Sequence, residues 1–230
     1  AYAHKAVNPF KLQVTMRFSQ EVQWADEDVQ IGVLQDLASN ASIALGRALD
    51  LVGIHKINPL TGTVSSLVKE GLVDTKQSVQ LAGTKYDEAI EAAAGMIISS
   101  GYVPSGIAMD PTLSFGLSTM RDADGRKIYP EIGFGQNLTN FSGMTAAVSD
   151  TVSAKNEITP DTKLLGIVGQ FDAFRWGVQR SIGAHLIEYG DPDGLGDLQR
   201  QNQIAIRAEI VYGIGIMDQA AFTKIVKAEE

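Results

Sequence analysis

The sequence has 230 residues, a length typical of one or two domains with a sizeable core. Hydrophobic residues make up 44% and charged residues 20%, the composition of a chain that folds along its whole length. The 19 Lys and Arg residues are outnumbered by 27 Asp and Glu, so the formal net charge of -8 disfavours sequence-specific nucleic-acid binding. The absence of cysteine excludes disulfides, thiolate metal sites and thiol nucleophiles.

The start of the chain and its hydropathy carry no targeting signal. No stretch approaches the roughly 20 consecutive apolar residues that span a bilayer, so we expect no membrane segment. The opening AYAHKAVNPF lacks a charged-then-apolar signal pattern and has no periodicity. We therefore expect an N-terminally shortened chain.

The first part of the sequence predicts a strand followed by one long helix. Apolar residues alternate with polar ones over 10–22, which predicts a half-buried strand. From about 26 to 52 the apolar residues recur three or four positions apart, which predicts an amphipathic helix about 40 Å long. The acidic residues at 26–28 would complement the positive amino end of this helix, and Gly53 would terminate it.

The middle of the sequence alternates between helical and strand-like segments. We place a domain crossing near Thr75, after a turn-rich stretch. Residues 85–100 predict an Ala-rich helix capped by Thr84. Asp110 as N-cap and Pro111 in the first turn open another helix, which runs to about Met120. The remaining segments are a short strand, a loop rich in Gly and Asn, and a second strand, at 107–109, 133–143 and 145–149.

The last third of the sequence is predicted to be mostly β-sheet. Five apolar segments have strand character, at 164–168, 174–180, 182–188, 204–212 and 213–217. Between the third and fourth lies the polar segment GDPDGLGDLQRQN at 190–202, which is long for a hairpin loop. We expect this loop to project from the sheet.

No motif in the sequence indicates catalysis, a metal or a cofactor. The histidines lie outside any triad or His-Glu-x-x-His pattern, at His4, His55 and His185. Asp191, Asp193 and Gly196 match three positions of an EF-hand loop, but Leu195 occupies the fifth position, where a ligand is needed. A solvated turn-rich loop therefore explains these residues better than calcium does. We expect no catalytic residue and no cofactor.

The order of several motifs resembles the major capsid proteins of tailed bacteriophages. RFSQEVQWADEDVQIGVLQDLASNASIALGRALDLVG is similar to the strand and long spine helix of that family. AMDPTLSFGLSTMRDADGRKIYP resembles its Asx-Pro helix with the Asp-x-x-Gly and Tyr-Pro segments that follow. The resemblance continues through GQFDAFRWGVQR, IRAE and AAF and covers about 9–226 of the chain. Each motif alone is weak, so the order carries the resemblance.

The resemblance implies an α+β chain with the Hong-Kong-type capsid fold. A β-rich peripheral domain with the spine helix would comprise 9–75 and 162–230, and an inserted α/β axial domain would comprise 76–161. Hexamers and pentamers of the chain would build an icosahedral shell around double-stranded DNA, with scaffold, portal and decoration proteins as partners. Such a subunit is made in the bacterial cytoplasm and ends in the virion. Without the family's N-terminal arm and extended loop, we expect a monomer or small oligomer in dilute solution.

The resemblance also implies where subunits would touch. The polar loop with Asp191, Asp193 and Asp197 would meet neighbours at three-fold positions. Some relatives form an isopeptide bond between a loop Lys and an Asn, assisted by a Glu seven residues later, and Asn202 and Glu209 match that spacing. The same Glu belongs to an Ile-Arg-x-Glu motif shared with relatives that do not cross-link, so both interpretations stay open.

Two other functions are compatible with these observations. An encapsulin-type bacterial nanocompartment shell has the same fold but encloses an enzyme instead of a genome. An unrelated α/β enzyme would require a deep pocket with convergent titratable groups.

Overall fold

The computed structural model describes residues 7–29, 32–133, 138–155, 157–158 and 161–228. The chain divides into two compact units. Val7–Leu49 and Trp176–Gly213 form what we call the three-stranded unit, and 50–175 with 214–228 form the six-stranded unit. The predicted axial domain, 76–161, lies within the six-stranded unit, whereas the predicted peripheral segments are divided between both units. The assignment of peripheral and axial domains stays a prediction.

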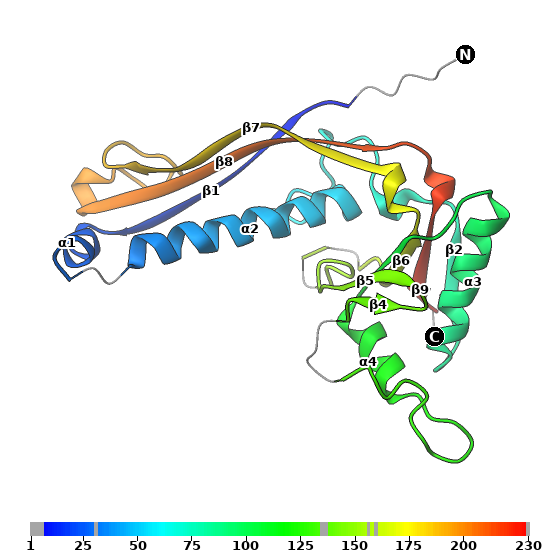
Figure 1. Cartoon of the computed structure of the whole chain (residues 1–230). Coiled ribbons are helices and arrows are strands. Elements are labelled where there is room, and N and C mark those ends of the chain that lie inside the picture. The colour runs from blue at the N-terminus through cyan, green and yellow to red at the C-terminus, as the bar shows by residue number, and fades with distance from the viewer. Residues whose placement is uncertain (1–6, 30–31, 134–137, 156, 159–160, 229–230) are drawn as a thin grey trace. The chain divides into compact units, whose positions relative to one another are not determined.

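The three-stranded sheet has the order β1-β8-β7 (Figure 1). Its strands are β1 Phe10–Ser19, β7 Phe174–Ile187 and β8 Gln203–Ile216. β1 pairs antiparallel with β8 from Phe10 opposite Tyr212 to Ser19 opposite Gln203. The predicted alternation in β1 is present, but the strand ends at Ser19 because a helix begins at the next residue. The strand pairs predicted at 174–188 and 204–217 are in fact the single strands β7 and β8.

The single helix predicted over about 26–52 is wrong. The structure has two helices, α1 Gln20–Val29 and α2 Val33–His55, so the acidic residues at 26–28 lie at the end of α1 and not before α2. Gly32, just before α2, has a φ of 77°, a left-handed conformation that glycine adopts without strain. The apolar periodicity runs through this break, which is why the sequence pattern did not reveal it.

The helix α2 continues past Gly53, its predicted terminus, to His55. A Cβ on Gly53 would stand 3.1 Å from Cζ of Phe174, so glycine serves close packing here. The left-handed residue that ends the helix is Lys56, with a φ of 58°. The 23 residues of α2 span about 34 Å.

By length and composition alone, residues Gln35–His55 of α2 could cross a membrane, which corrects our expectation that no stretch approaches this limit. One such helix is weak evidence of insertion, because the core helix of a soluble protein passes the same test. Leu51, Val52 and Ile54 of this helix are buried within the protein.

The six-stranded sheet has the mixed order β2-β9-β6-β3-β5-β4. β6 pairs antiparallel with β3 and β9, while β2 with β9 and β3 with β5 are parallel pairs. Sequence patterns missed β2, β4 and β9, which are short or lie at the end of the chain. The strands are β2 Ser78–Leu81, β3 Gly106–Met109, β4 Asn140–Phe141, β5 Met144–Val148, β6 Leu164–Gly169 and β9 Phe222–Lys227.

Two helices pack in this unit, α3 Tyr86–Ser99 and α4 Pro111–Thr119. The predicted cap of α4 is confirmed, because Asp110 Oδ1 accepts a hydrogen bond from the Thr112 amide at 2.7 Å. The predicted cap of α3 is wrong, since its N-cap is Lys85, which makes no side-chain capping bond. Short 3-10 helices occur at Leu72–Asp74, Phe171–Ala173, Gln199–Gln201 and Gln219–Ala221.

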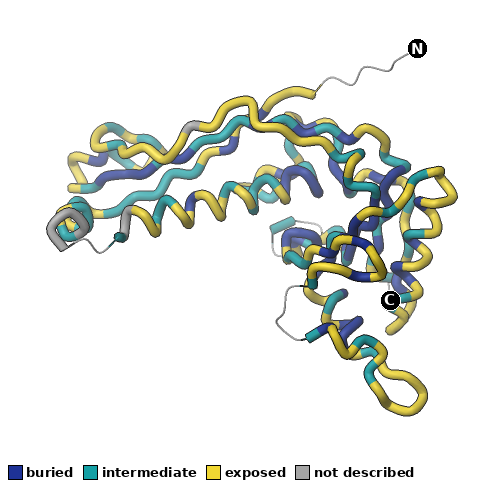
Figure 2. The backbone as a smooth tube through the Cα atoms, in the orientation of Figure 1, coloured by how far each residue is buried: buried dark blue, intermediate teal, exposed yellow. Residues whose placement is uncertain are grey.

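The core of the six-stranded unit lies between its central strands and α3, where buried positions concentrate (Figure 2). Phe222 of β9 and Ile97 of α3 are fully buried. Thr75, at the predicted domain crossing, is also buried, and its hydroxyl donates to the carbonyl oxygens of Phe222 at 2.7 Å and Gln219 at 3.0 Å. The crossing is therefore held firmly in the core and does not behave as a linker.

His55, at the end of α2, is a buried titratable group with one unsatisfied nitrogen. Its side-chain Nε2 donates to the carbonyl oxygens of Val152 at 2.9 Å and Thr151 at 3.2 Å. Within the described residues, the buried Nδ1 atom has no hydrogen-bond partner. Burial lowers the pKa of His55, against the opposing effect of the two carbonyl bonds.

The lowered pKa predicts a loss of stability in mild acid. The unfolded chain takes up this proton near the ordinary His pKa of about 6.5, whereas the folded chain binds it only at lower pH. The free energy of unfolding should therefore fall as pH drops below about 6.5 toward the folded-state pKa. Urea titrations at several pH values should show a steeper fall for the wild type than for His55→Gln. The exposed His185→Gln is the control, and an equal slope in His55→Gln would contradict the prediction.

Candidate functional site

The polar loop at 190–202, between β7 and β8, is the most distinctive surface feature that the sequence indicated. We expected it to project from the sheet, but it folds back and is anchored on it. Leu198 is fully buried, and its amide donates to the Gly190 carbonyl oxygen at 2.9 Å, which closes the loop. The Gln203 amide donates to the Leu198 carbonyl oxygen at 2.9 Å where β8 begins.

Arg17 of β1 is the centre of this anchorage. Its Nε donates to both carboxylate oxygens of Asp193 at 2.8 Å, and its Nη2 donates to Asp191 Oδ1 at 2.9 Å. Nη2 also donates to Asp193 Oδ1 and, at 2.9 Å, to the Gly196 carbonyl oxygen. Nη1 reaches Gln201 Oε1 at 3.2 Å. One guanidinium thus joins four loop residues, and its side chain is only 10% exposed.

The charges of this cluster stabilise one another. The hydrogen bond to Asp193 raises the pKa of Arg17, and the same bond lowers the pKa of Asp193. The guanidinium takes the place between Asp191 and Asp193 that a calcium ion would need. Across the described part of the chain, no group of three or more His, Asp or Glu side chains is arranged to hold a metal ion.

A second arginine, Arg207 of β8, fastens the same loop. Its Nη2 donates to the Pro192 carbonyl oxygen, and its Nε donates to Thr15 Oγ1 at 3.1 Å. Arg207 Nη1 also lies 3.8 Å from Glu209 Oε1, which in turn lies 3.4 Å from Lys11 Nζ. The polar face of β1 and β8 therefore carries a row of ion pairs, which Arg207 joins to the loop.

Sequence patterns did not single out Arg17 or Arg207. Each occupies a polar position of an alternating strand, and such positions are usually solvated. The register places Thr15 opposite Arg207 and Arg17 opposite Ala205, so both arginines belong to one face of the sheet. The only sequence signal was the excess of Asp in the loop, which needed a cation from elsewhere in the chain.

The other predicted site residues also have partners within the chain. Asp197 Oδ1 accepts a hydrogen bond from the amide of Arg200, in the short helix Gln199–Gln201, at 3.0 Å. Asn202 is left-handed, with a φ of 51°, and its Nδ2 donates to Glu21 Oε1 at 2.7 Å. The carboxylates of the loop thus shape it from inside. Its outward-facing large apolar side chains are Leu195, 69% exposed, and Tyr189 at its edge, 72% exposed.

The structure does not bring Asn202 and Glu209 together within one chain. Asn202 directly precedes β8, and Glu209 lies within this strand, opposite Gln13 of β1. Seven residues of extended strand separate them by about 23 Å.

This chain is similar in sequence and in fold to capsid proteins of phages. The sequence matches the model of the Phage capsid family over residues 1–227. The chain belongs to the phage capsid family. A solved chain from Mycobacterium phage Ogopogo is 48% identical to this capsid protein, with a TM-score of 0.88, and the match covers 96% of this chain and 76% of that one. The comparison with curated proteins returns no match.

Other solved chains extend the family's fold. A chain from Gordonia phage Cozz is 33% identical, with a TM-score of 0.84, over 98% of this capsid protein and 72% of the Cozz chain. A chain described as the capsid of an empty GTA particle shares the fold at 16% identity and a TM-score of 0.60, over 97% of this chain and 73% of that one. The predicted α+β capsid fold and the predicted tailed-phage capsid family are thereby confirmed.

The arginine anchorage predicts how the loop of this capsid protein responds to mutation. Arg17→Met removes the guanidinium but keeps an unbranched side chain, so the two aspartates lose their shared cation. We expect amide exchange over 190–198 to become at least about tenfold faster, because the loop closes less stably. Hydrogen exchange read by mass spectrometry measures this. Arg200→Met, an exposed arginine of the same loop, should leave exchange unchanged, and equal protection in Arg17→Met would contradict the prediction.

Proposed function

We propose that this capsid protein is the shell-building subunit of an icosahedral phage head that encloses double-stranded DNA, and that it works by assembly without catalysis. The observation that carries the proposal is the 48% identity to the Ogopogo phage chain over 96% of this chain. The chains from Ogopogo and Cozz, both above 30% identity, come from phages, which favours a head over an encapsulin-type nanocompartment. Hexamers and pentamers are the units we propose, with 76–161 as the axial domain and 9–75 with 162–230 as the peripheral domain.

The physical basis of this function is repetition. Each interface of a symmetric ring can be weak, because a subunit held by several neighbours dissociates only when all contacts break together. Scaffold, portal and decoration proteins would be the further partners, and synthesis would take place in the bacterial cytoplasm. No membrane partner is part of the proposal.

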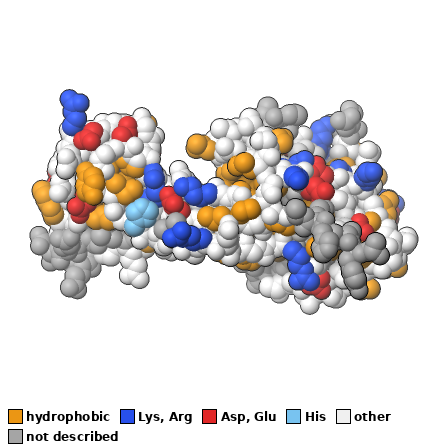
Figure 3. All heavy atoms as spheres, turned by 90° about the horizontal axis from the view of Figure 1, so that it is seen from above, with side chains coloured by type: hydrophobic (Ala, Val, Ile, Leu, Met, Phe, Trp, Pro, Cys, Tyr) orange, Lys and Arg blue, Asp and Glu red, His pale blue; other side chains and the backbone are white. Residues whose placement is uncertain are grey.

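Charge supports containment of DNA over tight binding. The net charge is -8. On the face seen in Figure 3, acidic and basic side chains are interspersed among hydrophobic and uncharged ones. A uniformly basic surface would bind phosphates strongly and in a salt-dependent manner, whereas this surface suits a genome that must later leave the shell.

We propose that the loop at 190–202 contacts neighbouring subunits through its apolar side chains. Asp191, Asp193 and Asp197 are already bonded within the chain, so they shape the contact surface. Leu195 and, at the edge of the loop, Tyr189 are its large apolar side chains that are exposed. A covalent cross-link through Asn202 assisted by Glu209 would require these two residues from different subunits, because one chain holds them far apart.

Assembly itself tests the proposed function. The protein is expressed from its complete gene, and sedimentation and electron microscopy follow the products. We expect closed shells, or rings of five and six subunits. A protein that stays monomeric at every concentration and salt condition would contradict the proposal.

The role of the loop has its own test in Leu195→Ser. This side chain is exposed in the single subunit, so the thermal midpoint of that subunit should stay the same. We expect assembly to need at least about tenfold more protein, because an apolar contact is repeated at every interface. Leu60→Ser, at an exposed leucine of another loop, is the matched control. Unchanged assembly of Leu195→Ser would exclude the loop as a contact.

A further inference from the structure

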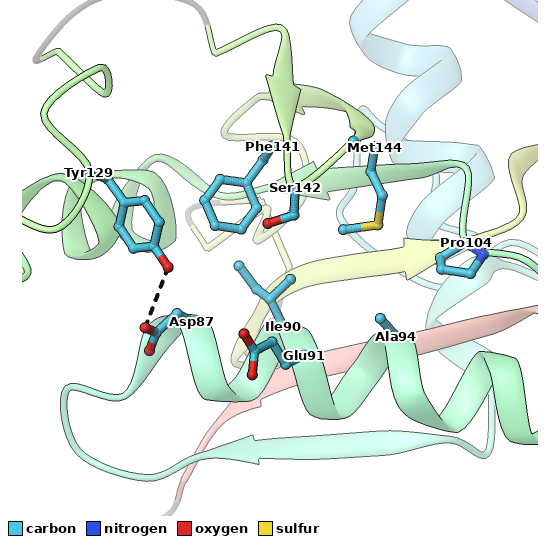
Figure 4. A pocket seen from close by; sticks show the side chains of 10 residues that line it. Asp87, Ile90, Glu91, Ala94, Pro104, Tyr129, Phe141, Ser142 and Met144 are labelled. Carbon is cyan, nitrogen blue, oxygen red and sulfur yellow. Dashed lines mark hydrogen bonds between the residues drawn. The ribbon is translucent and has the colours of Figure 1, made fainter.

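The six-stranded unit contains a small pocket with a volume of about 190 Å³ (Figure 4). One wall is the α3 helix, with Asp87, Ile90 and Glu91 facing the pocket. The opposite wall is the hairpin between β4 and β5, which contributes Phe141 and Met144. All the elements that line it belong to one compact unit.

The pocket combines an apolar interior with two carboxylates. Asp87 and Glu91 are one helical turn apart on α3, so their side chains share one face. Asp87 Oδ2 accepts a hydrogen bond from the Tyr129 hydroxyl at 3.4 Å. Within the described residues, the carboxylate of Glu91 makes no hydrogen bond or salt bridge. The rings of Tyr129 and Phe141 lie 5.4 Å apart, tilted by 59°, beside these acids.

Such a lining fits a long cationic side chain. The aliphatic stem of an arginine or lysine would pack against Ile90 and Met144, and its charged head would reach the two carboxylates. An aromatic ring beside the head adds a cation–π attraction. Lys85 lies near Asp87 but is paired with Glu88, and a small neutral ligand would leave Glu91 without a counter-charge.

A cation of this kind is presented by the same unit, on the hairpin at 121–127 that follows α4. Arg121 and Lys127 form its isolated bridge, and Asp122 Oδ1 accepts from the Asp124 and Arg126 amides at 3.0 and 2.8 Å. Residues 121–126 are all exposed. Figure 1 shows this hairpin extending away from the strands of its own unit.

Arg126 is the residue of this hairpin best placed to act outward. The Arg121 guanidinium is used within the hairpin, where it donates to the Gly125 carbonyl oxygen at 2.7 Å. Arg126 has its amide fixed by Asp122, and its exposed side chain forms no salt bridge with Asp87 or Glu91 of its own chain.

We infer that Arg126 of one subunit inserts into the pocket of a second copy, between Asp87 and Glu91. This inference rests on the proposed function as a shell subunit. The contact joins two different surfaces, so each subunit gives an arginine to one neighbour and receives one from another. Head-to-tail contacts of this type generate closed rings when the rotation between subunits closes. The pocket and the hairpin would then be the two halves of the contact within each ring.

Engineered cysteines test this geometry, because the native chain has none. The complete protein with Asp87→Cys and Arg126→Cys is assembled, mildly oxidised and run on a denaturing gel without reductant. We expect a ladder that extends beyond the dimer. Each single variant should give no ladder, and a mixture of the two should give dimers only. Dimers in a single variant, or no ladder in the double variant, would overturn the inference.

A matched pair and a charge exchange complete the test. As a control, Asp87→Cys is combined with Lys69→Cys, which places the second cysteine at an exposed basic residue outside the hairpin. This double variant should give no ladder. Arg126→Glu should raise the protein concentration needed for assembly at least about tenfold, and Glu91→Lys added to it should restore most of the loss. If the wild type assembles and Arg126→Glu assembles equally well, the inference is wrong while the proposed function stands. If the wild type forms no assembly, the proposed function is what has failed.

Discussion

The pairing of β1 with β8 is the interaction on which the three-stranded unit depends. It joins residues near the start of the chain to residues near its end, with Phe10 opposite Tyr212 and Phe18 opposite Ile204. This register collects apolar side chains on one face and Thr15, Arg17 and Arg207 on the other. Because side chains alternate, a slip of β1 by one residue would turn its apolar side chains to the polar face and move Arg17 away from the loop.

The loop at 190–202 shows how a polar segment can be rigid. Asp191 and Asp193 are separated by only one residue and would repel each other if solvated alone, but Arg17 supplies a shared counter-charge. The bonds are charge-assisted and several meet at one guanidinium, so the side-chain entropy of only one long residue is lost. A loop held this way can present Leu195 and Tyr189 in a fixed position to a neighbour. For a protein whose proposed activity is assembly, such order before contact reduces the entropic cost of each interface.

The pocket on α3 also has two carboxylates, but the cation that we propose for them comes from another subunit. At the loop the cation is internal and the carboxylates are satisfied, whereas Asp87 and Glu91 make no salt bridge to an arginine or lysine within the described residues. Lys85, the basic residue near Asp87, is paired with Glu88. A cation from a second molecule would neutralise the acidic pair of Asp87 and Glu91 in its partly apolar surroundings. In the loop, the charged residues shape the surface of one subunit. At the pocket, we propose that they join one subunit to another.

Local features and the family could be predicted from the amino-acid sequence alone. Alternation at 10–18 identified β1, the Asp110 cap identified α4, and the order of motifs along the chain indicated the capsid family. These signals are local or cumulative, so they can be recognised without knowing which distant residues meet.

The break before α2, the short strands β2 and β9, and the partners of the loop became visible only in the folded chain. Gly32 interrupts the helix by its backbone conformation, while the apolar periodicity continues on both sides. β2 and β9 pair in parallel although more than a hundred residues separate them, and short strands carry little pattern of their own. The β1–β8 register places Arg17 beside Asp191 and Asp193, and no local sequence pattern encodes this long-range pairing.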